Sequence, residues 1–459
     1  MSRPRVLVVG GGIAGLTAAL ACADGGARVT VLEAGGRLGG ATWSARREGL
    51  WVDNGQHVFL RACTAYRDFL ARIGATGLVE LQRRLAVPVI AADGPTAWLR
   101  RGSLPAPLQL GPSLIRYSHL GPFDRLRVAA GGLRLARLDP SREDLDRQTF
   151  AEWLAGNGQS PSAVERFWDL IALPTLNVRA AEASLALAAA TFQTGFFTDA
   201  AAADIGYARV PLDRVHAEPA GRALADARVE VLARHRVSRV DLDGTTATGV
   251  TVEGGHLAAE AVVLSVPHDE AAALLPAAAG VDNAGVRRLG SSPIVNLHVV
   301  YDRPVMGLAF AAGVGTPVQF VFDRTAASGI AQPDGRQYLA VSLSGADDYV
   351  SMSTEDLRSV FAAELARLFP RARRARMEQF FVTREPAATF RAVPGTAKLR
   401  PGTRTDVERL YLSGAWTDTG WPATMEGAAR SGQAAAAAAL AAIGLGDTEG
   451  RRRPEAIPA

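Results

Sequence analysis

Cysteine and lysine are scarce in this chain of 459 residues. The two cysteines, Cys22 and Cys63, exclude a disulfide framework and a multi-cysteine metal site. Lys398 is the single lysine, so nearly all positive charge is arginine, and a net charge of +4 is too small to indicate nucleic-acid binding. We therefore expect a protein of a reducing compartment, the cytoplasm, with no bound metal and no nucleic-acid partner.

Long apolar runs are also lacking. Residues 5–9 are apolar, but glycines follow at once, so the run is too short for a signal peptide. The longest apolar stretch, residues 434–443, is alanine-rich and falls short of the ~18 residues of a membrane span. An apolar content of 48% with 21% charged residues is typical of a soluble globular protein. The tail, residues 446–459, has three consecutive arginines and two prolines and is expected to be disordered.

The N-terminus carries the clearest pattern. An apolar run at residues 5–9 predicts a buried strand, a G-x-G-x-x-G loop and a helix follow, and a second strand at 28–32 ends at Glu33. Glycines permit close backbone approach to a pyrophosphate, and a carboxylate at this distance accepts ribose hydroxyls. The predicted dinucleotide contacts are Gly10, Gly12, Ile13, Ala14, Gly15 and Glu33. Both NAD and FAD use such a unit, so the pattern alone leaves the choice open.

The residues after Glu33 favour FAD. The segment Glu33-Ala-Gly-Gly-Arg-Leu-Gly-Gly40 resembles the E-A-x-x-R-x-G-G-R stretch of the flavin amine oxidase and phytoene desaturase superfamily. The resemblance implies that Arg37 and Gly40 contact the FAD ribose and phosphates. The last arginine of that stretch is Ala41 here, which puts one phosphate contact in doubt. A solvated surface arginine is the alternative for Arg37.

A distant segment supplies a second flavin motif. After a strand-like run at residues 409–413, a glycine-rich loop leads to a helix start, Met425-Glu-Gly-Ala428, which is similar to the superfamily's C-terminal flavin motif. The resemblance implies flavin contacts from Gly414, Met425 and Glu426, and an adenine contact from the backbone of Val237. An ordinary first helical turn is the alternative for Met425 and Glu426.

The fold class expected is α/β, a Rossmann-like FAD-binding domain with an interposed α+β substrate domain. The predicted FAD-binding domain comprises residues 1–85, 208–280 and 400–445. The predicted substrate-binding domain comprises residues 86–207 and 281–399. We expect strands at 294–301, 318–322 and 338–343, helices at 150–156 and 163–171, and a helix at 354–369 with Ser353 as its N-cap.

Four further stretches narrow the resemblance. Residues 53–57, 167–177, 211–220 and 420–427 together look like the squalene-associated FAD-dependent desaturases, also called hydroxysqualene dehydroxylases, of hopanoid pathways. That resemblance implies reduction of the allylic alcohol hydroxysqualene to squalene, a hydrophobic polyprenyl substrate, with hydride from reduced FAD. No second nucleotide-binding loop is visible, so an external reductant is expected. An oxidative desaturase or amine oxidase is the alternative, and a flavin-free lipid-binding protein, like the Rab GDP-dissociation inhibitors, is the remote one.

Candidate site residues follow from the same motifs. The family pattern places Gly55 and Gln56 near the flavin ring, with His57, Asp53 and Asp418 as candidate proton donors. His57 has an ordinary pKa suited to donation near neutrality, whereas Asp53 suits bracing of a turn. Trp416 and Trp421 are candidates for the walls of the substrate pocket, and packing in the protein core is an equal alternative for both.

A lipid substrate also suggests contact with the inner face of the cell membrane. Residues 115–137 mix apolar side chains with arginines, which suits a peripheral membrane surface. The alternative is an ordinary amphipathic helix that packs on the core.

Overall fold

The computed structural model describes residues 3–92, 94–139, 142–330 and 335–446. The expected tail, apart from residue 446, lies outside the described residues. The strands are β1 Arg5–Val9, β2 Arg28–Glu33, β3 Ser44–Arg47, β4 Leu50–Asp53, β5 Phe59–Leu60, β6 Val79–Leu81, β7 Ala86–Ile90, β8 Ala97–Arg100, β9 Ile205–Ala208, β10 Glu230–Ala233, β11 Val237–Asp243, β12 Thr246–Val252, β13 Gly255–Ala258, β14 Ala261–Leu264, β15 Ser292–Tyr301, β16 Phe310–Gly313, β17 Phe320–Asp323, β18 Gln337–Ser344, β19 Met377–Thr389 and β20 Leu410–Leu412. The α-helices are α1 Ile13–Asp24, α2 Thr64–Arg72, α3 Gly111–Ile115, α4 Pro122–Leu135, α5 Phe150–Gly156, α6 Pro161–Ala163, α7 Asp169–Leu176, α8 Leu185–Phe192, α9 Leu212–Val215, α10 Ala217–Asp226, α11 His268–Leu274, α12 Asn283–Arg287, α13 Thr325–Ser328, α14 Asp347–Val350, α15 Thr354–Leu368 and α16 Met425–Ala442.

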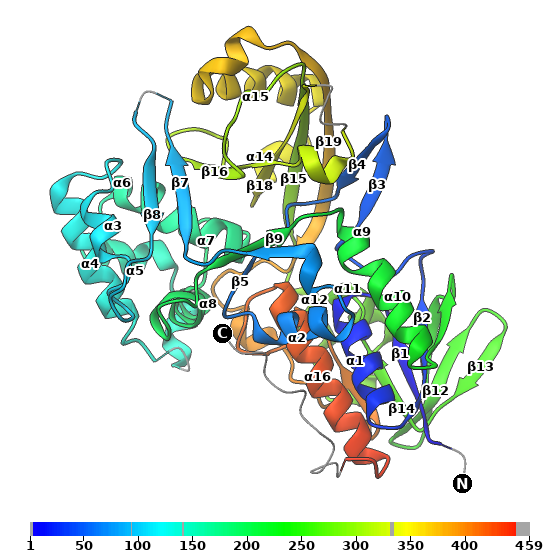
Figure 1. Ribbon diagram of the computed structural model, residues 1–459. Helices are drawn as coiled ribbons and strands as arrows, with labels where there is room; N and C mark the ends of the chain where they lie inside the picture. Colours follow the sequence, from blue (N-terminus) through cyan, green and yellow to red (C-terminus); the bar gives the residue numbers. More distant parts are fainter. Residues whose placement is uncertain (1–2, 93, 140–141, 331–334, 447–459) are drawn as a thin grey trace.

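A five-stranded parallel sheet organises the lower part of the molecule in Figure 1, with strand order β10-β2-β1-β14-β20. Its strands come from both ends and the middle of the chain. The central strand β1 has four buried residues in succession, because a parallel strand is covered on both faces. The fold is therefore the expected Rossmann-like α/β type.

Helices α1 and α16 lie side by side on this sheet (Figure 1). A Cβ added to Gly432 of α16 would collide with the carbonyl oxygen of Ala14 in α1, so glycine is needed where the helices cross. Gly414, which follows β20, donates its N–H to Ser431 Oγ at 2.8 Å and so ties the end of that strand to α16. The start of α1 thus packs against Gly432, about two turns into α16, near the carboxyl ends of the strands, where α/β sheets bind ligands.

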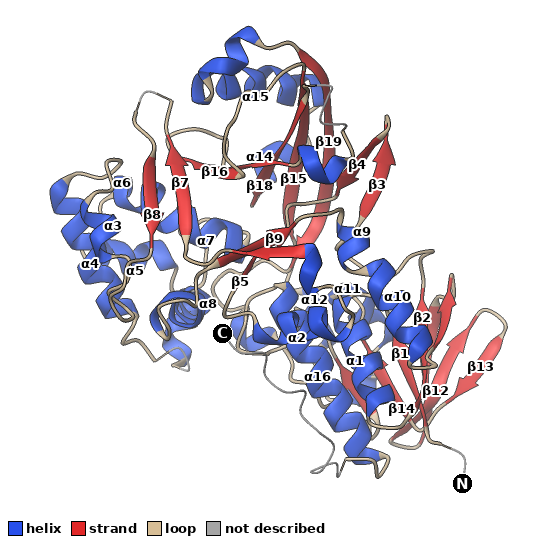
Figure 2. Ribbon diagram, in the orientation of Figure 1, coloured by secondary structure: helices blue, strands red, loops and turns tan. Residues whose placement is uncertain are grey.

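A second, seven-stranded sheet stands above the first, with order β19-β15-β18-β17-β16-β7-β8. Figure 2 shows helix α15 against this sheet and the helices α3–α8 grouped at its other end. Helix α15 begins one residue after Ser353, whose hydroxyl accepts from the N–H of Asp356 at 3.1 Å, so the predicted N-cap is confirmed. The strands at the sheet's two edges, β19 and the pair β7–β8, were not predicted.

The predicted helix at 163–171 is longer and less regular in the structure. Residues 161–176 form α6, a π-helical segment at Val164–Trp168, and α7, which continues past Pro174. Asn177 then ends α7 with a left-handed backbone, φ 57°. Within the described residues, no helix is long and apolar enough to cross a membrane.

Candidate functional site

The glycine loop after β1 is shaped by close contacts that a side chain would prevent. Gly10 has a φ of 108°, and a Cβ on Gly15 would overlap the Gly10 carbonyl oxygen. The first N–H groups of a helix have no intrahelical acceptor. In α1 the N-cap is Gly12, which has no side chain to accept from them, so these N–H groups are available to a ligand. Together these features form an anion-binding helix start of the kind that holds a pyrophosphate.

Glu33 braces this loop with both carboxylate oxygens. Oε2 accepts from the N–H of Gly11 at 2.7 Å, and Oε1 accepts from the N–H of Gly35 at 2.6 Å. The N–H of Gly39 in turn donates to the Gly11 carbonyl at 2.8 Å. A carboxylate has about four lone-pair sites, so Glu33 retains the capacity to accept from ribose hydroxyls.

Val237 and Arg37 lie near the same end of the sheet. The chain leading to Val237 follows the end of β2, because the N–H of His235 donates to the Glu33 carbonyl at 2.9 Å. The exposed Arg37 guanidinium lies over the Trp43 ring, 4.7 Å from its centroid, and Nη1 is 3.5 Å from the Gly40 carbonyl oxygen. Arg37 is therefore held by weak contacts and is free to turn toward a phosphate.

Glu426 is oriented away from the cofactor side of α16. Its buried carboxylate accepts from the N–H groups of Ala65 and Tyr66, at 3.2 and 2.8 Å, and from Arg430 Nε at 2.5 Å. These are the first-turn amides of α2, whose N-cap Cys63 supplies no side-chain hydrogen bond. The Glu426 side chain thus caps α2, and only its backbone N–H remains for a flavin.

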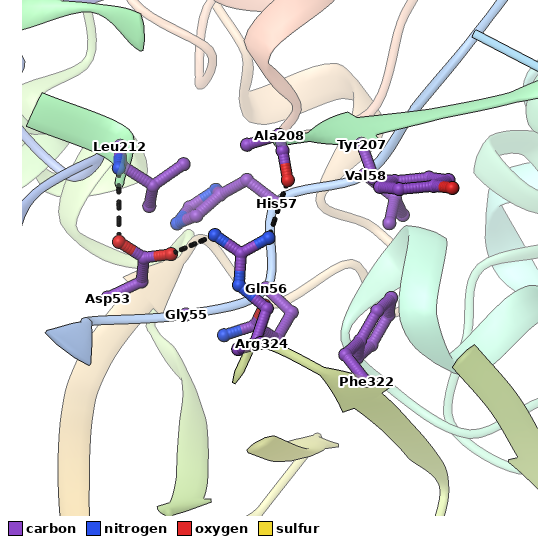
Figure 3. A pocket seen from close by; sticks show the side chains of 10 residues that line it. All are labelled: Asp53, Gly55, Gln56, His57, Val58, Tyr207, Ala208, Leu212, Phe322 and Arg324. Atoms are coloured by element: carbon purple, nitrogen blue, oxygen red, sulfur yellow. Dashed lines mark hydrogen bonds and ion pairs between the residues drawn. The ribbon is translucent and has the colours of Figure 1, made fainter. Parts of the chain in front are cut away.

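A small cavity of about 10 Å³ lies where three segments meet (Figure 3). Residues 53–58, 207–212 and 322–324 contribute its lining. Tyr207 and Phe322 form an aromatic side of the cavity, linked through Phe310 by ring-centroid distances of 6.0 and 5.7 Å. The predicted residues Gly55 and Gln56 line the same cavity, whereas Tyr207 and Phe322 had no signal in the sequence.

Asp53 and Arg324 form a buried ion pair beside this cavity (Figure 3), with Arg324 Nη2 2.8 Å from Asp53 Oδ2. The other oxygen of Asp53 accepts from Ser44 Oγ at 2.7 Å and from the Leu212 N–H at 3.0 Å. Arg324 also donates to the Ala208 carbonyl at 2.5 Å. Asp53 therefore holds three segments together, in keeping with the bracing role, and Arg324 is the partner that sequence reasoning missed.

His57 lines the cavity with Nε2 buried. Burial lowers the pKa of His57 to about 4, although the Asp53 carboxylate pulls it upward. The expectation of an ordinary pKa near neutrality is therefore wrong for this environment, and the imidazole is neutral at pH 7. Close by, burial and the His57 ring lower the pKa of His216 to about 3.

Several buried polar atoms near Gly55 and α16 lack a hydrogen-bond partner among the described residues. They are Gln56 Nε2, His57 Nε2, Asn296 Oδ1 and Thr419 Oγ1. A Cβ on Gly55 would lie 3.2 Å from His57 Nε2 and 3.7 Å from Asn296 Nδ2, so these side chains converge on the Gly55 backbone. A heteroaromatic ring with carbonyl and N–H groups would satisfy such atoms, since buried polar groups are normally paired.

The loop before α16 is held by a buried arginine. Arg400 donates to the carbonyls of Trp416, Thr417 and Trp421, at 3.2, 2.5 and 2.7 Å. Trp416 is 5% exposed and Trp421 is 9% exposed, and both belong to hydrophobic core clusters. Neither lines the cavity at His57, which favours the packing alternative for both.

Asp418 is exposed, and its Oδ1 accepts from the Gly420 N–H at 3.2 Å. It is not among the residues that line the cavity with His57. The structure thus brings Asp53 and His57 together and leaves Asp418 apart from them.

Comparison with known proteins agrees with this geometry. A model of the family described as flavin containing amine oxidoreductase matches residues 13–440. The chain belongs to this family. It is an FAD-dependent oxidoreductase, and the residues described above fit the cofactor: the α1 start suits the pyrophosphate, Glu33 the ribose, and the unpaired side-chain atoms of Gln56 and Asn296 near Gly55 the flavin ring.

The relatives found by sequence extend over almost the whole chain. Hydroxysqualene dehydroxylase of Rhodopseudomonas palustris is 30% identical, covering 95% of this chain and 98% of the relative. The 15-cis-phytoene desaturase of Glycine max is 24% identical, covering 98% and 81%. Among solved structures, a putrescine oxidase triple mutant matches with a TM-score of 0.70 and 22% identity, over 96% of this chain and 99% of that one. The last similarity shows the fold alone.

Proposed function

We propose that this protein reduces the allylic alcohol hydroxysqualene to squalene, as a step of hopanoid-type lipid synthesis. The proposal is carried by the 30% identity to a hydroxysqualene dehydroxylase over nearly the full length of both chains. It is supported by the cavity, where Asp53, residues 55–57 and Leu212, from two of the motifs that carry the resemblance, line one space.

The reaction balances with one hydride and one proton. Bound FAD, once reduced, supplies the hydride that forms the new C–H bond. The C–O bond breaks and the oxygen leaves as water, which consumes a proton. Two electrons for each turnover come from an external reductant, such as a reduced pyridine nucleotide or an electron-transfer protein.

The chain's own residues bind the reacting end of the substrate. His57 Nε2 is buried and unpaired among the described residues, and a neutral imidazole carries one N–H, so this nitrogen can donate a hydrogen bond to the departing oxygen. Tyr207 and Phe322 provide an apolar wall that excludes water from an allylic cation. Pockets for drug-sized ligands usually occupy ~300 Å³ or more, whereas the cavity of about 10 Å³ holds about one water molecule, so it must open before the substrate can enter.

The decisive experiment uses purified, photoreduced enzyme without oxygen. Added hydroxysqualene should restore the visible absorbance of oxidised flavin and yield squalene by mass spectrometry. Oxidised enzyme is incubated with phytoene in parallel, because the phytoene desaturase relative makes the oxidative direction the second candidate. Products from phytoene together with no squalene from hydroxysqualene would reverse the assignment.

The role of His57 is tested in the same assay. His57→Phe removes the hydrogen-bonding nitrogen and should lower kcat about 100-fold, within the range for positioned proton-handling groups. His57→Gln retains an N–H donor and should keep more activity than His57→Phe. Equal kcat in the wild type and His57→Phe, at equal flavin content, would remove His57 from the reaction.

A further inference from the structure

Helix α4 carries apolar side chains on two opposite sides. Val128 and Leu135 are buried against the core, at 2% and 0% exposure. Phe123 and Leu126 are 79% and 70% exposed, and Leu133 is 36% exposed. With 3.6 residues per turn, positions 123, 126 and 133 fall on the side opposite 128 and 135, where a surface helix normally has polar residues.

The end of α3 extends this exposed apolar side. Ile115 is 70% exposed, and α3 and α4 lie together at the outer edge of the helical group in Figure 1. We call Ile115, Phe123, Leu126 and Leu133 the α3–α4 patch. The segment between the helices is fixed, because Arg125 donates to the carbonyls of Ile115 and Leu120 at 2.6 and 2.9 Å. The patch is therefore presented by a firm scaffold.

The buried side of this segment is also anchored. Tyr117 is fully buried, and its hydroxyl donates to the Arg166 carbonyl at 2.8 Å. Gly131 lets α4 approach Gln159 and Trp168, since an added Cβ would lie 2.9 Å from Gln159 Nε2. A rotation of α4 that turned Phe123 and Leu126 into the core would break these contacts, so their exposure is a property of the fold.

Positive charge surrounds the patch. Residues 103–137 contain five arginines and a single acid, Asp124, although the net charge of the whole chain is only +4. Arg116, Arg127 and Arg134 are exposed, and Asp124 offsets little of this charge, with Oδ1 3.9 Å from Arg127 Nη1. The surface thus combines protruding apolar side chains with a basic border.

We propose that the α3–α4 patch binds the surface of an anionic lipid bilayer. Phe123, Leu126 and Ile115 would enter the boundary between headgroups and acyl chains, while the arginines contact anionic headgroups. The charge favours lipid over a second copy of this chain, because a symmetric pair would bring arginine against arginine. The inference rests on exposure and charge, and it does not depend on the proposed reaction.

The test is flotation of the FAD-loaded protein with vesicles. Binding is expected to vesicles of phosphatidylcholine mixed with phosphatidylglycerol and to be much weaker with pure phosphatidylcholine. Phe123→Ser with Leu126→Ser should lower the bound fraction about tenfold or more, because two inserted side chains are lost. Arg116→Gln with Arg127→Gln should reduce binding to anionic vesicles to the level seen with neutral ones.

The matched control is Val231→Ser with Val360→Ser, two apolar residues exposed at 36% and 40% outside the patch. It should bind vesicles like the wild type, and all variants should keep their flavin absorbance. No flotation of the wild type with anionic vesicles, or unchanged flotation of the Phe123/Leu126 variant, would overturn the proposal. So would concentration-dependent dimerisation abolished by that variant without vesicle binding, which identifies a second copy as the occupant. Turnover of detergent-dispersed hydroxysqualene reports separately on the proposed function.

Discussion

Arg324 reaches Asp53 across 271 residues of sequence, and both side chains are buried beside the candidate catalytic cavity. Arg324→Met should leave the Asp53 carboxylate without its countercharge and lower the free energy of unfolding by about 3–5 kcal/mol. Urea denaturation monitored by circular dichroism measures the change.

A double-mutant cycle provides the control for this pair. Asp53→Asn with Arg324→Met should cost less than the sum of the single changes, because neither charge is then left alone. Arg303→Met removes one member of an exposed pair with Asp302 and should change stability little. If Arg324→Met lowered the free energy of unfolding as little as Arg303→Met does, the buried ion pair of Asp53 and Arg324 would not stabilise the fold.

Two glycine substitutions separate folding from cofactor binding. Gly12 has a φ of −77°, and a Cβ there would meet only Gly40 Cα, at 3.8 Å. Gly12→Ala should therefore fold normally and lose FAD, because the methyl group occupies space that the pyrophosphate needs. Gly15→Ala should disturb the loop itself, since its Cβ overlaps the Gly10 carbonyl.

Absorbance of bound flavin and the melting temperature of the apoprotein are the two measurements for these glycine variants. Gly156→Ala is the control, because no atom lies within 4 Å of the added Cβ. Wild-type flavin content in Gly12→Ala would show that the cofactor does not approach this residue.

Buried histidines should make the protein sensitive to mild acid. Burial lowers the pKa of His57 to about 4 and the pKa values of His216 and His298 to about 3, from an ordinary 6.5. The unfolded chain therefore binds more protons than the folded one below pH 6.5, and stability falls as the pH drops toward 4. Each histidine should cost about 2 kcal/mol at about pH 5.

Denaturation curves between pH 4 and pH 6.5 measure how steeply the free energy of unfolding falls as the pH drops. His298→Gln should flatten this pH dependence. If the pH dependence of stability were the same in His298→Gln as in the wild type, burial would not lower the pKa of His298 as described.

Glu426 couples two helices through one carboxylate. Glu426→Gln removes the charge that faces the first amides of α2 and Arg430, and should lower the free energy of unfolding by about 1–3 kcal/mol. Glu355→Gln is the matched control, since Glu355 also occupies the first turn of a helix but is exposed. Equal melting temperatures for the two variants would show that the α2 cap contributes nothing.

Local sequence patterns were sufficient to predict the strand, the glycine loop and the acidic residue at the nucleotide-binding end of the parallel sheet. The strand, the glycine loop and Glu33 are within 30 residues of one another, and their spacing alone fixes how they meet. The N-cap Ser353 was predictable for the same reason. These features depend on backbone geometry over a few turns of chain, which sequence order largely determines.

The cavity wall depended on distant contacts. Arg324 is one of many arginines, and nothing near it in sequence indicates Asp53 as its partner. Strand β19 has the sequence MEQFFVTREPAAT, in which charged and apolar residues do not alternate strictly. The alternation that would predict a half-buried strand is therefore missing. The pKa of His57 likewise depends on burial by segments far away in the chain, which its neighbours in sequence do not reveal.

The edge strand β20 has a consequence for how the protein is made. It pairs with β14, and α16 follows it, so the parallel sheet gains this strand only after residue 412 and one of its covering helices only after residue 442 has been synthesised. A nascent chain on the ribosome therefore carries the Gly10–Gly15 loop until α16 has been made, and only then is the sheet with its covering helices complete. Domains usually fold in order from the N-terminus, but here the segment with the glycine loop must wait for a strand and a helix that are made much later.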